Sequence, residues 1–245
     1  MAGLEPATQP ARVRAAERLA KGLEFHCDWQ ESRARTDVRA LGGRVALRLP
    51  GHDDSFWITA HLPNEAMTPA DVLKFWFDEL KPRQWFKADM ALDDQIRLRF
   101  GAVHGKLSQS VPGAWRAGPR EVLAAVIVLD QFSRNIHRGK ASAFANDAAA
   151  LSLAEEAIDK GFDRALSITE RQFLYMPFQH SEDATTQARS VELFESLREP
   201  NAAKYAHAHR DIIARFGRFP HRNAILGRAS TQEELAFLKL PGSSF

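Results

Sequence analysis

A chain of 245 residues with 44% hydrophobic and 26% charged residues has the composition of a soluble globular protein. Its net charge of +2 gives no bulk positive field, which argues against nucleic acid as the partner. A single cysteine, Cys27, excludes an intrachain disulfide and a cysteine-based zinc cluster, and it fits a reducing cytoplasm. No stretch approaches the roughly 20 apolar residues of a membrane helix, so we expect no membrane association.

The first 65 residues differ from the rest of the chain, because their acidic and basic residues are scattered without a period. We expect an N-terminal extension over residues 1–65 that is flexible or weakly structured. The alternative is a pair of short strands over Arg44–Leu49 and Phe56–Ala60, and a helix over Arg12–Phe25 is possible. Two strands alone are marginal in water, which favours the flexible extension.

Helical signals begin at Thr68, where Thr-Pro-Ala-Asp has the order of a capped helix start. A second helix is predicted over residues 89–110, because apolar residues recur there every three or four positions. A third begins at Pro119 and contains the apolar run Val122–Leu129, which predicts a helix buried on all sides. Further helices are expected over residues 142–161, from Ser167, and over 184–197, 200–216 and 231–238.

Two capping boxes are expected at the starts of late helices, one from Ser167 to Glu170 and one from Ser230 to Glu233. No alternating strand pattern is found after residue 65. Residues 66–245 are therefore predicted to form one all-α domain of antiparallel helix pairs joined by short connectors. Stacked helix pairs, as in tetratricopeptide-like α-α superhelices, are the natural architecture for such a pattern.

The segment Asp130–Asn135 is the first with candidate chemistry. Asp130 ends the apolar run, so its carboxylate is expected to be buried and to need a partner. Arg134 lies one helical turn further on and is the natural partner. The pair either fixes a helix end or orients Arg134 toward a ligand.

The segment Met176–Asp183 gathers one histidine and two acids just after a proline. His180 and Glu182 are only two candidate metal ligands, so a polar network is favoured over a metal site, and no metal or cofactor is predicted. Asp183 is expected to cap the following helix. His209 falls on an apolar helical stripe, which is typical of a core histidine.

The segment Phe216–Arg228 combines arginine, histidine and asparagine with aromatic residues, and residues 212–232 contain four arginines and no acid. Gly217 is expected to end a helix with a positive φ, and Pro220 to begin a short one. Arginine forks bind carboxylate or phosphate through paired hydrogen bonds, which favours an anion site here. The alternative is that these arginines stack on aromatic rings and pair with acids such as Asp130, Glu182 and Asp183.

These segments carry a family resemblance. The sequences LDQFSRNIHRG (129–139), FLYMPFQHSED (173–183) and FGRFPHRNAILGR (216–228) resemble the bacterial family of unknown function called DUF924, as do VLKFWF (72–77) and the set Trp85, Phe86 and Asp89. The resemblance covers about residues 68–240 and implies an all-α, tetratricopeptide-like fold without an established activity. Ser133 stands where most members have proline, a departure that leaves Arg134 and Asn135 in place.

Three hypotheses about function are compatible with these residues. The first is binding of a small anionic ligand, carrying phosphate or carboxylate, in one cavity lined by Arg134, Asn135, Arg138, Arg218, His221, Arg222, Asn223 and Arg228. The second is a hydrolase in the same cavity, with His180 or His221 as general base and Glu182 or Asp130 as its orienting acid. The third is a scaffold that binds a protein partner, with the arginines as internal clamps between helices.

Overall fold

The computed structural model describes residues 37–41, 44–48, 58–61 and 67–243. They fall in two compact units, residues 1–65 and residues 66–245. In the first unit, β1 (Asp37–Leu41), β2 (Arg44–Arg48) and β3 (Ile58–His61) form an antiparallel sheet in the order β1-β2-β3. Strands β2 and β3 overlap the two segments for which strands were the alternative, whereas the possible helix over Arg12–Phe25 lies outside the described residues.

The second unit confirms the predicted all-α class, since every regular element within residues 67–243 is a helix. Its first half contains α2 (Pro69–Leu73), η1 (Lys74–Glu79), α3 (Pro82–Trp85), α4 (Met90–Leu107), η2 (Gly113–Trp115), α5 (Pro119–Val126), η3 (Ile127–Phe132), α6 (Ser133–Ile136) and η4 (Ala141–Phe144). Its second half contains α7 (Asp147–Asp159), η5 (Phe162–Ala165), α8 (Ile168–Gln179), α9 (Ala184–Ser196), α10 (Pro200–Phe216), η6 (Pro220–Arg222) and α11 (Gln232–Phe237). No described helix is long and apolar enough to cross a membrane.

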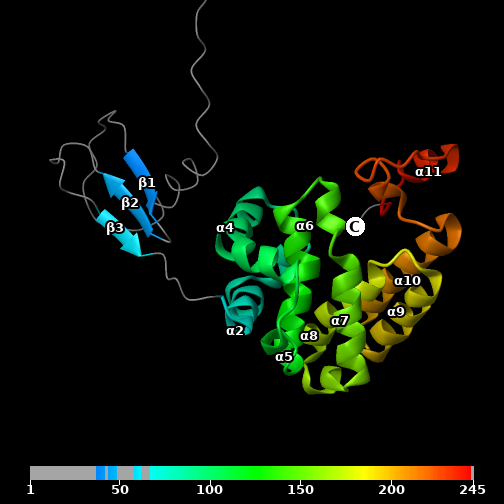
Figure 1. The fold of residues 1–245 in the computed structure, drawn as a ribbon. Helices are drawn as coiled ribbons and strands as arrows, with labels where there is room; N and C mark the ends of the chain where they lie inside the picture. Colours follow the sequence, from blue (N-terminus) through cyan, green and yellow to red (C-terminus); the bar gives the residue numbers. More distant parts are fainter. Residues whose placement is uncertain (1–36, 42–43, 49–57, 62–66, 244–245) are drawn as a thin grey trace, which may run out of the picture. The chain divides into compact units, whose positions relative to one another are not determined.

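Consecutive helices pack on one another from α7 to α10 in this unit (Figure 1). Helix α8 packs on α9 and α9 on α10, while α5 lies centrally against α2, α7 and α8. The run Val122–Leu129 is fully buried, as its all-apolar composition predicts. The repeated pairing of consecutive helices is compatible with a tetratricopeptide-like superhelix, which stays a prediction.

Local signals indicate most helix ends correctly. Thr68, Ser167 and Asp183 cap α2, α8 and α9 through their side chains. Gly217 ends α10 with a φ of 66°, and Pro220 begins the short helix η6. The capping box expected from Ser230 to Glu233 is wrong by one residue, because the Thr231 hydroxyl accepts from the Glu234 amide and the Glu234 carboxylate accepts from the Thr231 amide.

Candidate functional site

The central helix of the unit changes its hydrogen-bonding pattern at the first candidate segment. After α5 the chain winds as a π-helix through η3 and returns to an α-helix in α6. Such π segments inside α-helices are frequent at functional sites, because they shift the side chains that come after them. Asp130 lies in η3 and is fully buried. Arg134 Nη1 lies 2.9 Å from Asp130 Oδ1 and donates to the Asp130 carbonyl oxygen at 2.8 Å, which confirms the expected pairing.

Asp130 has two further side-chain partners. His180 Nδ1 lies 2.7 Å from Oδ1, and Gln131 Nε2 donates to Oδ2 at 2.5 Å. Burial alone raises the pKa of the Asp130 carboxyl, but the charge of Arg134 and the contact with His180 outweigh it and leave that pKa well below its ordinary value. Asp130 is therefore a buried, ionised carboxylate with partners on both oxygens.

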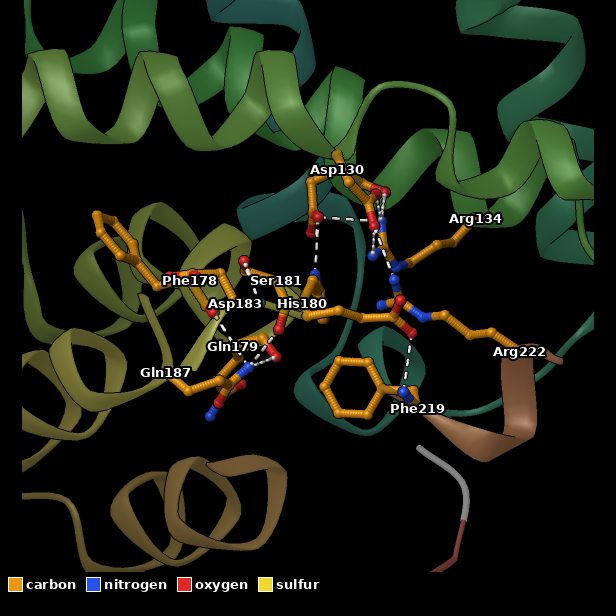
Figure 2. A network of polar contacts seen from close by, with 12 residues as sticks. Asp130, Arg134, Phe178, Gln179, His180, Ser181, Asp183, Gln187, Phe219 and Arg222 are labelled. Carbon is orange, nitrogen blue, oxygen red and sulfur yellow. Dashed lines mark hydrogen bonds and ion pairs between the residues drawn. The ribbon is translucent and has the colours of Figure 1, made fainter. Parts of the chain in front are cut away.

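His180 is held in place at the end of α8. Gln187, from α9, donates through Nε2 to the carbonyl oxygens of Gln179 and Ser181, both at 2.7 Å (Figure 2). Burial and the charge of Arg134 lower the pKa of His180, although Asp130 opposes the shift. The imidazole is thus neutral at pH 7. Its Nδ1–H donates to the carboxylate, so the lone pair lies on Nε2.

Two arginines from distant segments meet on one carboxylate, that of Asp147 at the start of α7. Arg134 donates to both of its oxygens, at 3.0 and 3.2 Å, and Arg222 Nη1 donates to Oδ2 at 3.2 Å. Figure 2 shows the side chains of Arg134 and Arg222 extending toward each other. We call Arg134, Asp147, Arg222 and the rings of Phe144 and Phe219 the Asp147 site.

Arg222 is the most enclosed arginine of the Asp147 site. Its guanidinium carbon lies 4.5 Å from the centre of the Phe144 ring and 4.8 Å from that of Phe219. Only 6% of the residue is exposed, and burial lowers its pKa although Asp147 opposes the shift. Among the described residues, its buried Nε–H has no hydrogen-bond partner.

Glu182 organises the neighbouring loop. Arg228 donates to its two oxygens at 2.6 and 2.9 Å, and the Phe219 amide donates to Oε1 at 2.8 Å. Burial raises the pKa of Glu182, but these hydrogen bonds outweigh it and lower that pKa overall. Because Glu182 fixes the backbone at Phe219, it also positions the ring that covers Arg222.

The remaining predicted ligand residues lie elsewhere. Arg138 and Asn135 both bind Asp93, on α4, with Arg138 contributing hydrogen bonds of 2.5 and 2.8 Å. Arg218 binds both oxygens of Glu234 at 2.7 and 2.8 Å, and Asn223 donates to Ser230. The structure therefore brings Arg134 and Arg222 together on Asp147, with Arg228 on the neighbouring Glu182. That all eight residues line one cavity stays a prediction.

Two further histidines border the cluster. The His209 ring lies 6.3 Å from that of His180 and 5.6 Å from Phe219, and burial lowers its pKa to about 3, which fits the predicted core histidine. The His221 ring lies 5.6 Å from Phe219, and burial followed by the charge of Arg222 lowers its pKa to about 4. Both imidazoles are neutral at pH 7. Among the described residues, no group of three or more histidine, cysteine, aspartate or glutamate side chains is placed to hold a metal.

Sequence reasoning missed Asp147 and Phe144. Asp147 stands between Asn146 and a run of alanines, with no motif around it. Its acidic side chain in the first turn of a helix looks like an ordinary response to the helix dipole. The charge surplus of residues 212–232 was the one available signal, since four arginines without an acid require carboxylates from other elements.

The comparisons with known proteins agree with this fold. The family model described as bacterial protein of unknown function, DUF924, matches residues 72–242. The chain belongs to this family. A solved structure of a protein of unknown function from Agrobacterium tumefaciens is 41% identical to this DUF924 chain, covers 70% of it and 96% of its own length, and superposes with a TM-score of 0.67. No protein of curated function matches.

Proposed function

We propose that this DUF924 protein binds a small ligand carrying a carboxylate or phosphate group at the Asp147 site. The observation that supports this most is the position of Arg222, which is 6% exposed and shares the carboxylate of Asp147 with Arg134. Arginine–carboxylate pairs are frequently joined by two parallel hydrogen bonds. Arg222 makes one bond to Asp147, at 3.2 Å, so an anionic ligand can satisfy it better than Asp147 does.

The Nε–H of Arg222, which has no partner among the described residues, points to the same conclusion. A buried donor without a partner costs about 1–3 kcal/mol, so native proteins seldom keep one without a reason. An oxygen of a carboxylate or phosphate that reaches Nε and Nη together would restore the paired geometry of an arginine fork. The rings of Phe144 and Phe219 hold the guanidinium plane in place, which limits the reorganisation that binding requires.

The start of α7 adds a second attraction for an anion. Its N-cap residue, Asn146, makes no side-chain capping hydrogen bond, and its Nδ2 donates to Ser108 Oγ and Ser133 Oγ. The first turn of α7 therefore lacks a side-chain cap from Asn146, and the carboxylate of its first residue, Asp147, contacts both arginines. Asp147 supplies negative charge at this position, where a ligand carboxylate or phosphate would compete with it.

The test is a thermal-shift series with inorganic phosphate, succinate and citrate against the wild-type protein. A ligand at about 100 times its Kd adds about 2.7 kcal/mol of stability, which raises the Tm by several degrees for a unit of this size. Asp147→Asn removes the competing charge and should strengthen binding about tenfold, whereas Arg222→Ala should weaken it about 100-fold or more, because a hydrogen-bonded charge pair contributes on the order of 3 kcal/mol.

The matched control is Arg215→Ala. Arg215 lies in the last turn of α10, stacks on Phe216 at 4.7 Å and pairs with Glu233, but its side chain is 51% exposed. This variant should bind as the wild type does. If no anion stabilises the wild type or Asp147→Asn, while Arg222→Ala only destabilises the fold, the Asp147 site is a structural clamp and the proposal is wrong.

A further inference from the structure

We propose that His180 is a general base that activates water to hydrolyse an ester of the anion held at the Asp147 site. This inference rests on the proposed function and adds a reaction to it. The substrate class is a small ester that keeps a free carboxylate or phosphate charge for Arg134 and Arg222. Asp130 acts as the positioning residue for His180.

The contact between Asp130 and His180 has the geometry of a catalytic dyad. The carboxylate Oδ1 lies 2.7 Å from His180 Nδ1, and Asp130 is fully buried and held on its other oxygen by Gln131. A carboxylate fixed in this way selects the imidazole tautomer that keeps Nε2 unprotonated, and it stabilises the imidazolium that forms when Nε2 accepts a proton. Gln187 fixes the backbone on either side of His180, so the ring is placed before any ligand arrives.

Nε2 of His180 is available for this role. The side chain of His180 is 16% exposed. Within the described residues its Nε2 has no hydrogen-bond partner, and this nitrogen is not fully buried. A largely buried imidazole with one nitrogen tied to a buried carboxylate and the other open is the arrangement that general-base catalysis needs.

Arg134 connects the dyad to the anion site. The same Nη1 lies 2.9 Å from Asp130 and 3.0 Å from Asp147, so one guanidinium contacts both carboxylates. The charges of Arg134 and Asp147 both act on His180, so a ligand anion that replaces Asp147 on Arg134 would lie within electrostatic range of the imidazole. The charged and titratable groups around His180 are Asp130, Arg134, Asp147 and His209, with His221 and Arg222 next to them.

The proposed step conserves atoms and charge. Nε2 takes a proton from water while the water oxygen forms a bond to the electrophilic carbon or phosphorus of the ester. The bond from that atom to the alcohol oxygen then breaks, and the alcohol leaves with the proton returned by Nε2. Arg134 and Arg222 stabilise the negative charge that accumulates during the attack. The products are an acid and an alcohol, and no oxidant or reductant takes part.

The experiment compares two anionic probes, 4-nitrophenyl phosphate and the mono-4-nitrophenyl ester of succinate, with neutral 4-nitrophenyl acetate. Hydrolysis of at least one anionic probe, in preference to the neutral one, is expected, and the probe that reacts identifies phosphoryl or acyl transfer. His180→Gln should lower kcat by about 100-fold or more at unchanged affinity for phosphate and succinate. Arg222→Ala should lower kcat as well, because Arg222 stabilises the developing charge, but unlike His180→Gln it should also raise KM and weaken phosphate and succinate binding.

The control is His207→Gln. His207 Nε2 also lies 3.0 Å from a carboxylate, that of Glu195, but the pair is exposed on the surface and should leave both kcat and KM unchanged. Asp130→Asn should lower kcat without raising KM and should shift the His180 tautomer in ¹⁵N NMR. A purely structural Asp130 would not produce that combination.

A second measurement does not depend on the probe esters. Diethyl pyrocarbonate reacts with neutral imidazoles that it can reach, so His180, whose side chain is 16% exposed, should be modified faster than the buried His209, and phosphate should protect it. If phosphate binds but His180 resists modification and neither anionic probe is hydrolysed, the general-base role is wrong and the binding proposal stands. If phosphate and succinate do not bind at all, the proposed function itself fails.

Discussion

Two carboxylates in this helical unit bind arginines in different ways. Asp93 receives two hydrogen bonds from Arg138, at 2.5 and 2.8 Å, and one from Asn135. Asp147 instead divides its oxygens between Arg134 and Arg222, at distances of 3.0–3.2 Å. The first arrangement fills the acceptor sites of the acid with matched donors. The second leaves a buried arginine with a single shared bond to its acid.

This difference in pairing indicates that the Asp93 cluster has a structural role, whereas the Asp147 site can bind a ligand. The Asp93 cluster ties α6 and the residues after it to α4, and Arg138 can hydrate if the acid is removed, because 44% of its side chain is exposed. Arg222 cannot be hydrated in the same way, because only 8% of its side chain is exposed. A guanidinium that is costly to desolvate and incompletely paired is stabilised by any anion that reaches it. We therefore expect added anions to stabilise the Asp147 site and to leave the Asp93 cluster unaffected.

The largest effect is expected for Asp147→Ala in a buffer without multivalent anions. Removal of one partner from a buried ion pair typically costs about 3–5 kcal/mol, and Arg222 would lose the carboxylate that it binds. Added phosphate should recover much of this loss, because it takes the place of the carboxylate. Urea unfolding with and without phosphate measures both quantities. A loss of stability that phosphate does not repair would class the Asp147 site with the Asp93 clamp.

Acidification is expected to destabilise the fold through its buried neutral histidines. Burial and the neighbouring His137 lower the pKa of His104 to about 4, below its ordinary value. The unfolded chain therefore binds the proton first, so stability is complete above a pH of about 6.5 and is lost as the pH falls toward 4, by up to about 3 kcal/mol for this residue. Urea unfolding between pH 7 and pH 4 measures the slope.

The variant His104→Gln measures how much His104 contributes to the loss of stability between pH 7 and pH 4. Its Nε2 lies 2.8 Å from Ser133 Oγ in a buried network with Asn146, and none of the side chains of the Asp147 site belongs to that network. The variant should flatten the curve between pH 6.5 and 4 and leave anion binding unchanged. An unchanged slope would place the acid sensitivity in His180, His209 or His221 instead.

A smaller loss, about 2 kcal/mol, is expected for Asp93→Ala. Hydrogen bonds to charged groups contribute about 1.5–3 kcal/mol, and hydration of the exposed Arg138 offsets part of what is lost. Phosphate should not restore this stability, in contrast to Asp147→Ala. Urea unfolding of Asp93→Ala and Asp147→Ala, with and without phosphate at matched ionic strength, tests this difference. An equal gain of stability from phosphate in both variants would show that the two clusters do not differ in anion binding.

The fold could be predicted largely from local signals, whereas the partners in the site could not. Thr68, Ser167 and Gly217 mark helix ends through interactions within one turn, and the run Val122–Leu129 indicates its own burial. The one misplaced capping box lies in a run of serine, threonine and two glutamates, where adjacent registers have the same composition. Signals of this kind depend only on residues a few positions apart.

Pairing across the fold depends on residues much further apart. Asp130 and Arg134 are predictable partners because they lie one helical turn apart, but Arg222 and Asp147 are 75 residues apart. The similar sequences around Arg134 and Arg222 predict that their arginines line one cavity. In the structure, however, Arg138 pairs with Asp93 and Arg218 pairs with Glu234. Which acid an arginine meets depends on the packing of several helices, and the π-helical turn at Asp130 leaves no mark in the sequence.

The smallest effect is expected when an arginine of the segment 131–139 is replaced by lysine. This segment contributes Arg138 to the Asp93 cluster and Arg134 to the Asp147 site. Arg138→Lys replaces a fork that binds Asp93 through Nε and Nη2 with a single ammonium, so it should cost about 1 kcal/mol and leave anion affinity intact. Arg134→Lys keeps the charge beside Asp130 but loses the geometry that reaches two carboxylates, so phosphate affinity should fall about tenfold, which corresponds to about 1.4 kcal/mol. Calorimetric titration of both variants with phosphate measures the difference. Equal affinities would mean that charge alone, and not the arginine fork, attracts the ligand.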